Sequence, residues 1–232
     1  MFAVIVNTLA IVAAVFIGLL LRKGLPERIS ENVIKALGLC TVIIGVQGAI
    51  KEDNILIMII SVVIGVTIGE SIDADGRVNR FTDRLLRRGS SKVNSSKLTE
   101  AFITSCLIMN VGAMVIVGSL DAGLRADYTM LYTKSLLDFI SGIMMTAAMG
   151  IGVLGSAIFT LLFQGGIVLL AEYLSPYLSD AIIREMSCNG CLLIFALGLN
   201  MLGLTKFKVI NYLPTLVVAP MVLAAFDYFG FI

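Results

Sequence analysis

The feature that most constrains this chain is a series of apolar stretches, each close to the length that crosses a lipid bilayer. A hydrocarbon core roughly 30 Å thick needs about 20 apolar residues in helical form. Eight such stretches are separated by short turns and one longer polar segment, and they lie at about 2–22, 30–50, 54–72, 100–120, 129–149, 153–173, 181–203 and 208–229. Because backbone groups in lipid must be paired within their own segment, we predict an all-α polytopic membrane protein with about eight transmembrane helices. Seven helices with one re-entrant element fit the same pattern, because the turn at residues 150–155 is very short.

The composition agrees with this interpretation and excludes several classes of protein. Hydrophobic residues make up 58% of the 232 residues and charged residues only 14%, whereas soluble domains use about 25% charged residues. Eight spans leave no room for a second domain, so residues 1–232 are predicted to form a single transmembrane domain. The chain contains no histidine, which excludes histidine acid–base catalysis and imidazole-ligated metal sites. We expect no enzyme activity, no metal and no cofactor.

The polar segment at residues 73–99 indicates how the chain is oriented. It carries a run of basic residues, namely Arg77, Arg80, Arg84, Arg87, Arg88, Lys92 and Lys97. By the positive-inside rule this segment is cytoplasmic. Counting eight crossings outward from it predicts that both termini lie outside.

Part of the same segment has the pattern of an interfacial helix. Val78, Phe81 and Leu85 recur at helical spacing, opposite a basic face. Such a helix lies in the plane of the membrane surface with its arginines on anionic lipid headgroups; here these would be Arg77, Arg80, Arg84, Arg87 and Arg88. A nucleic-acid-binding arm needs several stacking aromatic residues, and Phe81 is the one aromatic residue in residues 73–99. We therefore expect lipid and no nucleic acid as the partner.

Two short segments resemble each other and indicate an internal repeat. Residues 25–35 and 174–184 each contain a proline turn, a serine followed by an acidic residue, two β-branched residues and a basic residue. They begin the second and seventh predicted helices, which run in opposite directions. Helices 1–3 and 6–8 would then form an inverted repeat, an arrangement found in many secondary transporters. The residue preferences shared by the first turns of most helices could also produce this similarity.

Two charged residues lie within the fifth apolar stretch. Lys134 and Asp138 are four residues apart and therefore share one helix face. Asp138 lies near the middle of its helix, where an unpaired charge costs roughly 2.5–3.5 kcal/mol on insertion scales. We predict that the two side chains pair or face a cavity, and that Asp138 binds a small solute, a proton or another ion.

Uncharged amides occur inside other apolar stretches and could complete this site. Candidate ligands are Asn110, Gln47, Asn189 and Asn200. Each amide could instead hydrogen-bond one helix to another, which contributes about 0.6 kcal/mol per pair.

The residues also resemble a known family over nearly the whole chain. The more specific matches are Val111–Ser119 and Lys134–Asp138, and weaker ones occur at residues 6–8, 25–28, 68–70 and 150–157. Together they resemble the bacterial membrane-protein family called domain of unknown function 554. The resemblance implies a multi-pass protein of the bacterial inner membrane, and it implies no substrate. Asn110 stands where we expect a cysteine in relatives, so a thiol function at that position would not carry over.

Three functions fit these observations. The first is a secondary transporter or permeation protein for a small solute or ion, coupled to a proton or cation; ATP coupling within the chain is not expected, because no Gly-x-x-x-x-Gly-Lys-Ser/Thr run is present. The second is a membrane thiol oxidoreductase that uses Cys188 and Cys191, although a single C-x-x-C pair is a weak signal. The third is a non-transporting scaffold, in which glycine-rich helix faces allow close approach and assembly as a homo-oligomer such as a homodimer.

Overall fold

The structure is a computed structural model that describes residues 1–22, 27–78, 80, 95–111 and 113–229. The regular secondary structure of these residues is helical, which confirms the all-α prediction for this part of the chain. The residues group into two compact units. Unit 1 comprises Met1–Leu37 and Leu86–Tyr177, and unit 2 comprises Gly38–Leu85 and Leu178–Ile232. The single transmembrane domain stays a prediction, because a compact packing group need not be a domain that folds alone.

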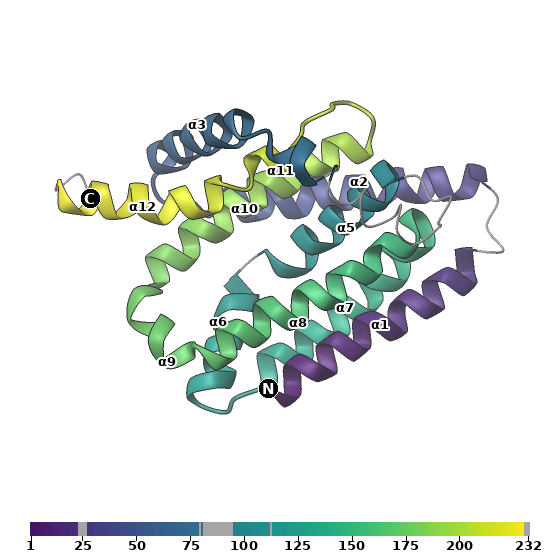
Figure 1. The fold of residues 1–232 in the computed structure, drawn as a ribbon, viewed down its shortest axis with the longest axis horizontal. Coiled ribbons are helices and arrows are strands. Elements are labelled where there is room, and N and C mark those ends of the chain that lie inside the picture. The colour runs from purple at the N-terminus through teal and green to yellow at the C-terminus, as the bar shows by residue number, and fades with distance from the viewer. Residues whose placement is uncertain (23–26, 79, 81–94, 112, 230–232) are drawn as a thin grey trace. The chain divides into compact units, whose positions relative to one another are not determined.

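Unit 1 is built around three long helices. Its elements are α1 (Phe2–Arg22), α5 (Ser95–Asn110), α6 (Ala113–Leu124), α7 (Thr129–Met149), η1 (Ile151–Val153), α8 (Leu154–Leu169), α9 (Ala171–Leu174) and η2 (Ser175–Tyr177). Helix α1 packs along α7 and α8, and α8 also contacts α5 and α6 (Figure 1). The interior of unit 1 therefore lies among α1, α7 and α8.

Small residues allow α1 and α7 to approach closely. A Cβ atom added at Gly18 would lie 2.6 Å from Thr146 Cβ and 2.7 Å from the Ile143 carbonyl oxygen. A Cβ added at Gly142 would lie 2.9 Å from Ala14 Cβ. The glycines of these two helices thus serve packing within the chain, as close-packed membrane helices require.

Two connections in unit 1 differ from continuous helix. The predicted helix at 100–120 is interrupted after Asn110, and α5 and α6 are bent by 60° relative to each other. The chain reverses between α7 and α8 at Gly150, whose φ of 90° favours glycine, and continues through η1. The short turn expected at residues 150–155 is therefore present, with one 3-10 turn inside it.

Unit 2 contains the second part of α2 and the C-terminal helices. Its elements are α2 (Glu27–Ala49, which belongs to unit 2 from Gly38), α3 (Ile55–Ser71), α10 (Asp180–Met201), α11 (Val209–Tyr212) and α12 (Thr215–Tyr228). Helix α3 contacts α10, α11 and α12. The span predicted at 208–229 is divided, because Pro214 begins α12 at a position where its missing N–H is not needed.

Contacts within each unit show that three helix pairs run antiparallel. Along α2, the ideal Cβ positions of Gly38, Gly45 and Gly48 meet Met201, Phe195 and Cys191 of α10, so partner numbers fall as α2 advances. Along α3, Ile57 packs with Val218 and Val222 of α12, whereas Gly65 meets Thr215. In unit 1, Val4 of α1 clusters with Val168 of α8, whereas Ile11 clusters with Ala157.

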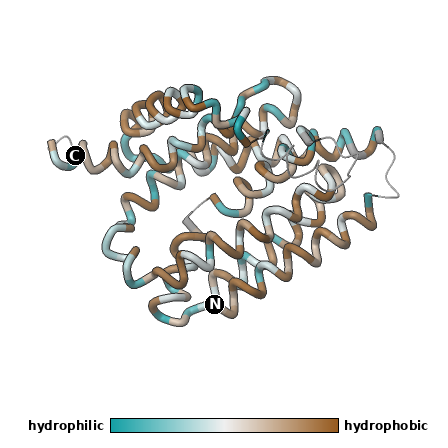
Figure 2. The backbone as a smooth tube through the Cα atoms, viewed as in Figure 1, coloured by the Kyte–Doolittle hydropathy of each residue, from teal (hydrophilic) through white to brown (hydrophobic). Residues whose placement is uncertain are grey.

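Fewer than eight of the described helices are both long enough and apolar enough to cross a membrane. Among the described residues, five helices meet these conditions, or six if the bent pair α5 and α6 forms one span. Helix α3 is 17 residues long, and α7 carries Lys134 and Asp138. Figure 2 shows hydrophobic residues along most helices and hydrophilic residues mainly at the connections. A membrane protein with several spans is supported, whereas the count of eight is not confirmed.

Much of the basic segment lies outside the described residues. Val78 is helical, but the predicted interfacial helix cannot be followed further, because Phe81, Leu85, Arg84, Arg87 and Arg88 are not described. Arg80 donates to Asp73 at 3.0 Å in an exposed ion pair. This contact and the hydrogen bond from Gly76 lower the pKa of the Asp73 carboxyl.

Candidate functional site

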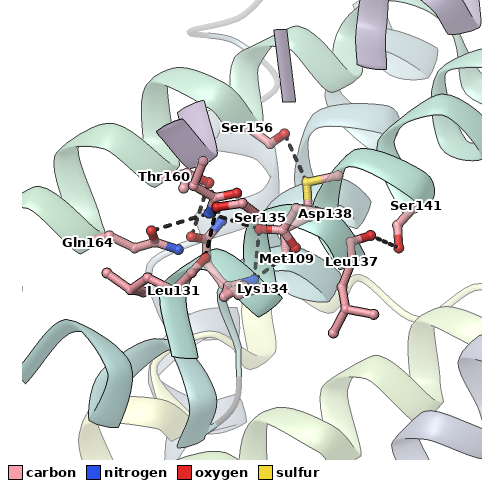
Figure 3. Close-up of polar contacts among 12 residues, drawn as sticks. Met109, Leu131, Lys134, Ser135, Leu137, Asp138, Ser141, Ser156, Thr160 and Gln164 are labelled. Carbon is pink, nitrogen blue, oxygen red and sulfur yellow. Dashed lines mark hydrogen bonds and ion pairs between the residues drawn. The ribbon is translucent and has the colours of Figure 1, made fainter. Parts of the chain in front are cut away.

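The centre of unit 1 contains an ion pair between Lys134 and Asp138. Both lie on α7, where the four-residue spacing places them on one face. Lys134 Nζ lies 2.8 Å from each carboxylate oxygen of Asp138, and the two residues are 5% and 4% exposed. The predicted pairing of these two side chains is therefore present in the structure, and both face the interior of the unit (Figure 3).

Two amides from the neighbouring helices complete this polar layer. Asn7 of α1 donates from Nδ2 to Asp138 Oδ2 at 3.0 Å and to Gln164 Oε1 of α8 at 3.2 Å. Asn7 and Gln164 are fully buried. The layer thus joins α1, α7 and α8 through side chains alone, and its four members are Asn7, Lys134, Asp138 and Gln164.

The hydrogen bonds of this layer are incomplete. Asn7 Oδ1 and Gln164 Nε2 are buried and have no partner among the described residues. One atom is an acceptor and the other a donor, so a small polar molecule with both capacities could bond to the two amides. A buried polar atom without a partner costs about 1–3 kcal/mol, which makes an additional ligand or water favourable here.

Apolar clusters lie on both sides of the layer along the helices. On one side, Val4, Leu131 and Val168 pack together with Ala3 and Ala122. On the other side, Ile11, Met145 and Ala157 belong to a second cluster. The ion pair therefore lies between two apolar layers contributed by the same three helices.

A polar stripe on α8 extends the site toward the break between α5 and α6. Ser156, Thr160 and Gln164 recur every four residues and are fully buried. Asn110, the last residue of α5, donates to Thr160 Oγ1 at 2.9 Å and accepts from it at 3.1 Å. Asn110 thus adjoins the layer through Thr160 and is not hydrogen-bonded to Asp138 or Lys134.

Asp127 forms a hydrogen bond with the first residue of α7. Its carboxylate accepts a hydrogen bond from the Thr129 backbone N–H at 3.0 Å. The backbone and hydroxyl of Thr129 lower the pKa of Asp127. A negative charge at this helix end is stabilised by the backbone N–H groups, and it helps to set the register in which α7 presents Asp138.

The other predicted ligands lie in unit 2. Gln47 is exposed on α2. Asn189 is fully buried and donates to the Glu185 backbone oxygen at 2.9 Å. Asn200 bonds with Thr205 and with both backbone groups of Phe207, so it organises the connection after α10. Within unit 2 these three amides form no common cluster through the hydrogen bonds of the described residues.

A second buried acid was missed in the sequence. Glu185 of α10 is 2% exposed, and the carboxyl group of Glu52, in the connection after α2, lies beside it. Two neighbouring carboxyl groups repel each other when both are ionised, so a charge on both is unfavourable. The rule that singled out Asp138, a carboxyl inside an apolar stretch, would also have found Glu185.

The four cysteines are free thiols. Cys188 is buried and Cys191 half-buried on α10, where Cys191 Sγ lies against Gly48 of α2. Cys106 is buried and Cys40 exposed.

Comparison with known proteins gives relatives but no activity. The chain is 30% identical to "Uncharacterized membrane protein YdfK" of Bacillus subtilis (strain 168), over 99% of both chains. It is 27% identical to "Uncharacterized protein YqgA" of Escherichia coli (strain K12), over 92% of both chains. No solved structure matches the chain. The family model described as "Protein of unknown function (DUF554)" matches residues 2–224, so the chain belongs to this family of membrane proteins.

Proposed function

We propose that this protein is a secondary transporter or permeation protein for a small polar solute or ion, coupled to a proton or cation. Asp138 is the coupling site and Lys134 its internal partner. Asn7 and Gln164, which belong to the same hydrogen-bonded layer, are its uncharged ligands. Asn110 acts at the edge of the site, whereas Gln47, Asn189 and Asn200 are not needed for it.

The observation that carries this proposal is the polar layer around Asp138, whose hydrogen bonds are incomplete among the described residues. A buried ion pair adds little stability compared with apolar packing of the same volume. Here it is combined with two buried amide atoms that have no partner in the part of the chain that the structure describes, Asn7 Oδ1 and Gln164 Nε2. Polar groups at membrane depth mark substrate and ion pathways more often than structural sites. Because apolar clusters flank the layer, the structure would correspond to an occluded state.

The helix arrangement supports the same proposal. The bend after Asn110 lies beside the polar stripe on α8, and interrupted helices line the sites of many transporters. The predicted counterparts in the inverted repeat are the pairs α1 and α8, α2 and α10, and α3 and α12. Each pair is in contact and antiparallel within its unit, as helices related by an axis in the membrane plane would be.

The location and orientation belong to the proposal as well. We place the protein in the bacterial inner membrane, with residues 73–99 in the cytoplasm and both termini outside, because basic residues concentrate in that segment. Arg77, Arg80 and the other arginines of the segment would contact anionic headgroups. A homodimer is compatible with the proposal but is not required for it.

The scaffold hypothesis is the stronger alternative. Glycines that suggested assembly are used for contacts inside the chain, such as Gly45 against Phe195 and Gly48 against Cys191. A scaffold also gives no reason for the unpaired amide atoms beside Asp138. The thiol hypothesis rests on Cys188 and Cys191, which carry free thiols in the structure.

The experiment is a flux assay in proteoliposomes with the Asp138→Asn variant. Substitution by asparagine keeps the shape of the side chain and removes the charge, so proton-, sodium- or potassium-dependent flux should fall at least tenfold. Lys134→Met combined with Asp138→Asn serves as the control, because it removes both charges and avoids an unpaired lysine. Unchanged flux in a stably folded Asp138→Asn protein would exclude Asp138 as the coupling site. No flux in the wild type for any ion tested would favour the scaffold.

A further inference from the structure

A basic cavity lies at the end of unit 1 where α1 ends and α5 begins. Its volume is about 380 Å³, and the basic residues that line it are Arg22 and Lys97. The remaining side chains of the wall are apolar, namely Leu19, Leu98, Met149 and Ile151. The wall contains no acidic residue among the described residues, and neither Arg22 nor Lys97 forms an ion pair with them.

The elements around the cavity place the two cations at its wall. Arg22 is in the last turn of α1, and its guanidinium occupies the space that a side chain at Gly150 would fill. Lys97 is in the first turns of α5, where the helix dipole adds positive potential. Gly152 brings the turn after α7 against α5, because a Cβ there would lie 2.6 Å from the Leu98 carbonyl oxygen.

A second cavity adjoins the first along α1. It has a volume of about 530 Å³ and is lined by Phe16, Leu19, Leu20 and Arg22. Leu19 and Arg22 line both cavities, so the two adjoin these residues. Phe16 and Leu20 are 63% and 69% exposed, although both are large apolar side chains.

This combination matches the chemistry of one ligand class. A phosphodiester group carries one negative charge and acceptor oxygens that suit Arg22 and Lys97. An acyl chain attached to it would follow Phe16 and Leu20. A free anion would leave the apolar groove unused, and a neutral lipid would leave the two cations without a counter-charge.

We propose that these two cavities bind one anionic phospholipid, with its phosphate between Arg22 and Lys97 and one acyl chain along Phe16 and Leu20. The site shares no residue with the Asp138 layer. It holds a single lipid in a fixed position beside the turn between α7 and α8. Basic pockets between membrane helices bind anionic headgroups in this way.

The test measures lipid binding by native mass spectrometry of the full chain in detergent. Phosphatidylglycerol is compared with phosphatidylcholine of the same acyl chains. Each basic side chain near an anionic lipid surface contributes about 1 kcal/mol, so Lys97→Gln should weaken phosphatidylglycerol binding about fivefold and Arg22→Gln with Lys97→Gln about 30-fold. Binding of phosphatidylcholine should not change.

Arg125→Gln is the matched control, because Arg125 is an exposed arginine of unit 1 outside both cavities and is paired with Asp121. It should change phosphatidylglycerol binding less than twofold. The Lys97→Gln protein keeps the test valid if the double variant fails to fold. The proposal would be overturned if the folded variants bound phosphatidylglycerol as tightly as the wild-type protein does. Displacement of the lipid by an equal concentration of inorganic phosphate would also overturn it, because the cavity would then be a site for soluble anions.

Discussion

Unit 1 and unit 2 each bury a carboxyl group inside a long helix, but the two groups are compensated differently. In unit 1, Asp138 accepts hydrogen bonds from Lys134 and from Asn7. In unit 2, Glu185 lies beside another acid, Glu52. The first arrangement balances a negative charge with a positive one, whereas the second brings two acids together, which disfavours a charge on both.

The difference shows that burial alone does not determine what a membrane carboxyl does. Asp138 lies in the middle of α7, one turn after its own base, so the pair is built into the helix spacing. Glu185 lies near the start of α10, and its partner comes from a connection distant in sequence. The charge of Asp138 is therefore balanced within its own helix, whereas the surroundings of Glu185 depend on a group that the fold brings to it.

The largest expected effect comes from removing the base of the unit 1 pair. Lys134→Met leaves Asp138 buried without a counter-charge, which costs about 3–5 kcal/mol in the free energy of unfolding. Adding Asp138→Asn should restore most of this loss. Unfolding of the solubilised full chain, followed as a double-mutant cycle, measures both effects. If the single variant were as stable as the wild type, the buried pair would not be the main compensation for Asp138.

A smaller effect should follow from filling a helix contact in unit 2. A Cβ at Gly45 would lie 2.5 Å from the Phe195 backbone nitrogen and 2.6 Å from its Cα, and backbone atoms cannot yield as a side chain can. Gly45→Ala should therefore destabilise the protein by about 1–3 kcal/mol. Gly166→Ala on α8 is the control, because no atom lies within 4 Å of its Cβ position; it should be neutral or stabilising by about 1 kcal/mol. Equal melting temperatures for the two variants would contradict this account of Gly45.

The acid pair of unit 2 can be tested by replacing one of its acids with an amide. Glu185→Gln removes one of two neighbouring acids and can donate a hydrogen bond to Glu52, so it should not lower the free energy of unfolding by more than about 1 kcal/mol. Glu185→Ala offers Glu52 no donor and should cost about 1–3 kcal/mol. Thermal unfolding at neutral pH compares the two variants. An equal loss in both would argue against a direct interaction between Glu185 and Glu52.

The smallest effect is expected at the exposed ion pair of unit 2. Arg80 lowers the pKa of Asp73 below its usual value, so this contact stabilises the fold above the unfolded-state pKa of about 3.9 and is lost as the pH falls through the folded-state pKa. Arg80→Gln should lower the melting temperature slightly at pH 7 and leave it unchanged in strong acid. Melting temperatures between pH 7 and pH 2 measure this. A difference that persists in acid would show that Arg80 acts by packing and not through Asp73.

The sequence by itself determined the class of fold and one ion pair, because both depend on local spacing. Apolar stretches of bilayer length predict helices whatever their partners are, since lipid cannot satisfy backbone groups. The four-residue interval between Lys134 and Asp138 predicts a shared helix face without knowledge of the tertiary structure. Gly150 and Pro214 likewise mark where helices turn or begin, whereas Pro220 lies inside α12.

Only the tertiary structure decided which distant side chains meet. Asn7 and Gln164 are 157 residues apart, and nothing in either segment indicates that they bond to each other beside Asp138. Gln47, Asn189 and Asn200 are the same kinds of residue, yet Gln47 is exposed and the other two form hydrogen bonds elsewhere. An amide in an apolar helix favours a partner, because an unpaired polar group is costly in lipid, but helix rotation and packing choose that partner. The count of eight spans stays a prediction, since the bend after Asn110 and the polar face of α7 depend on neighbouring helices.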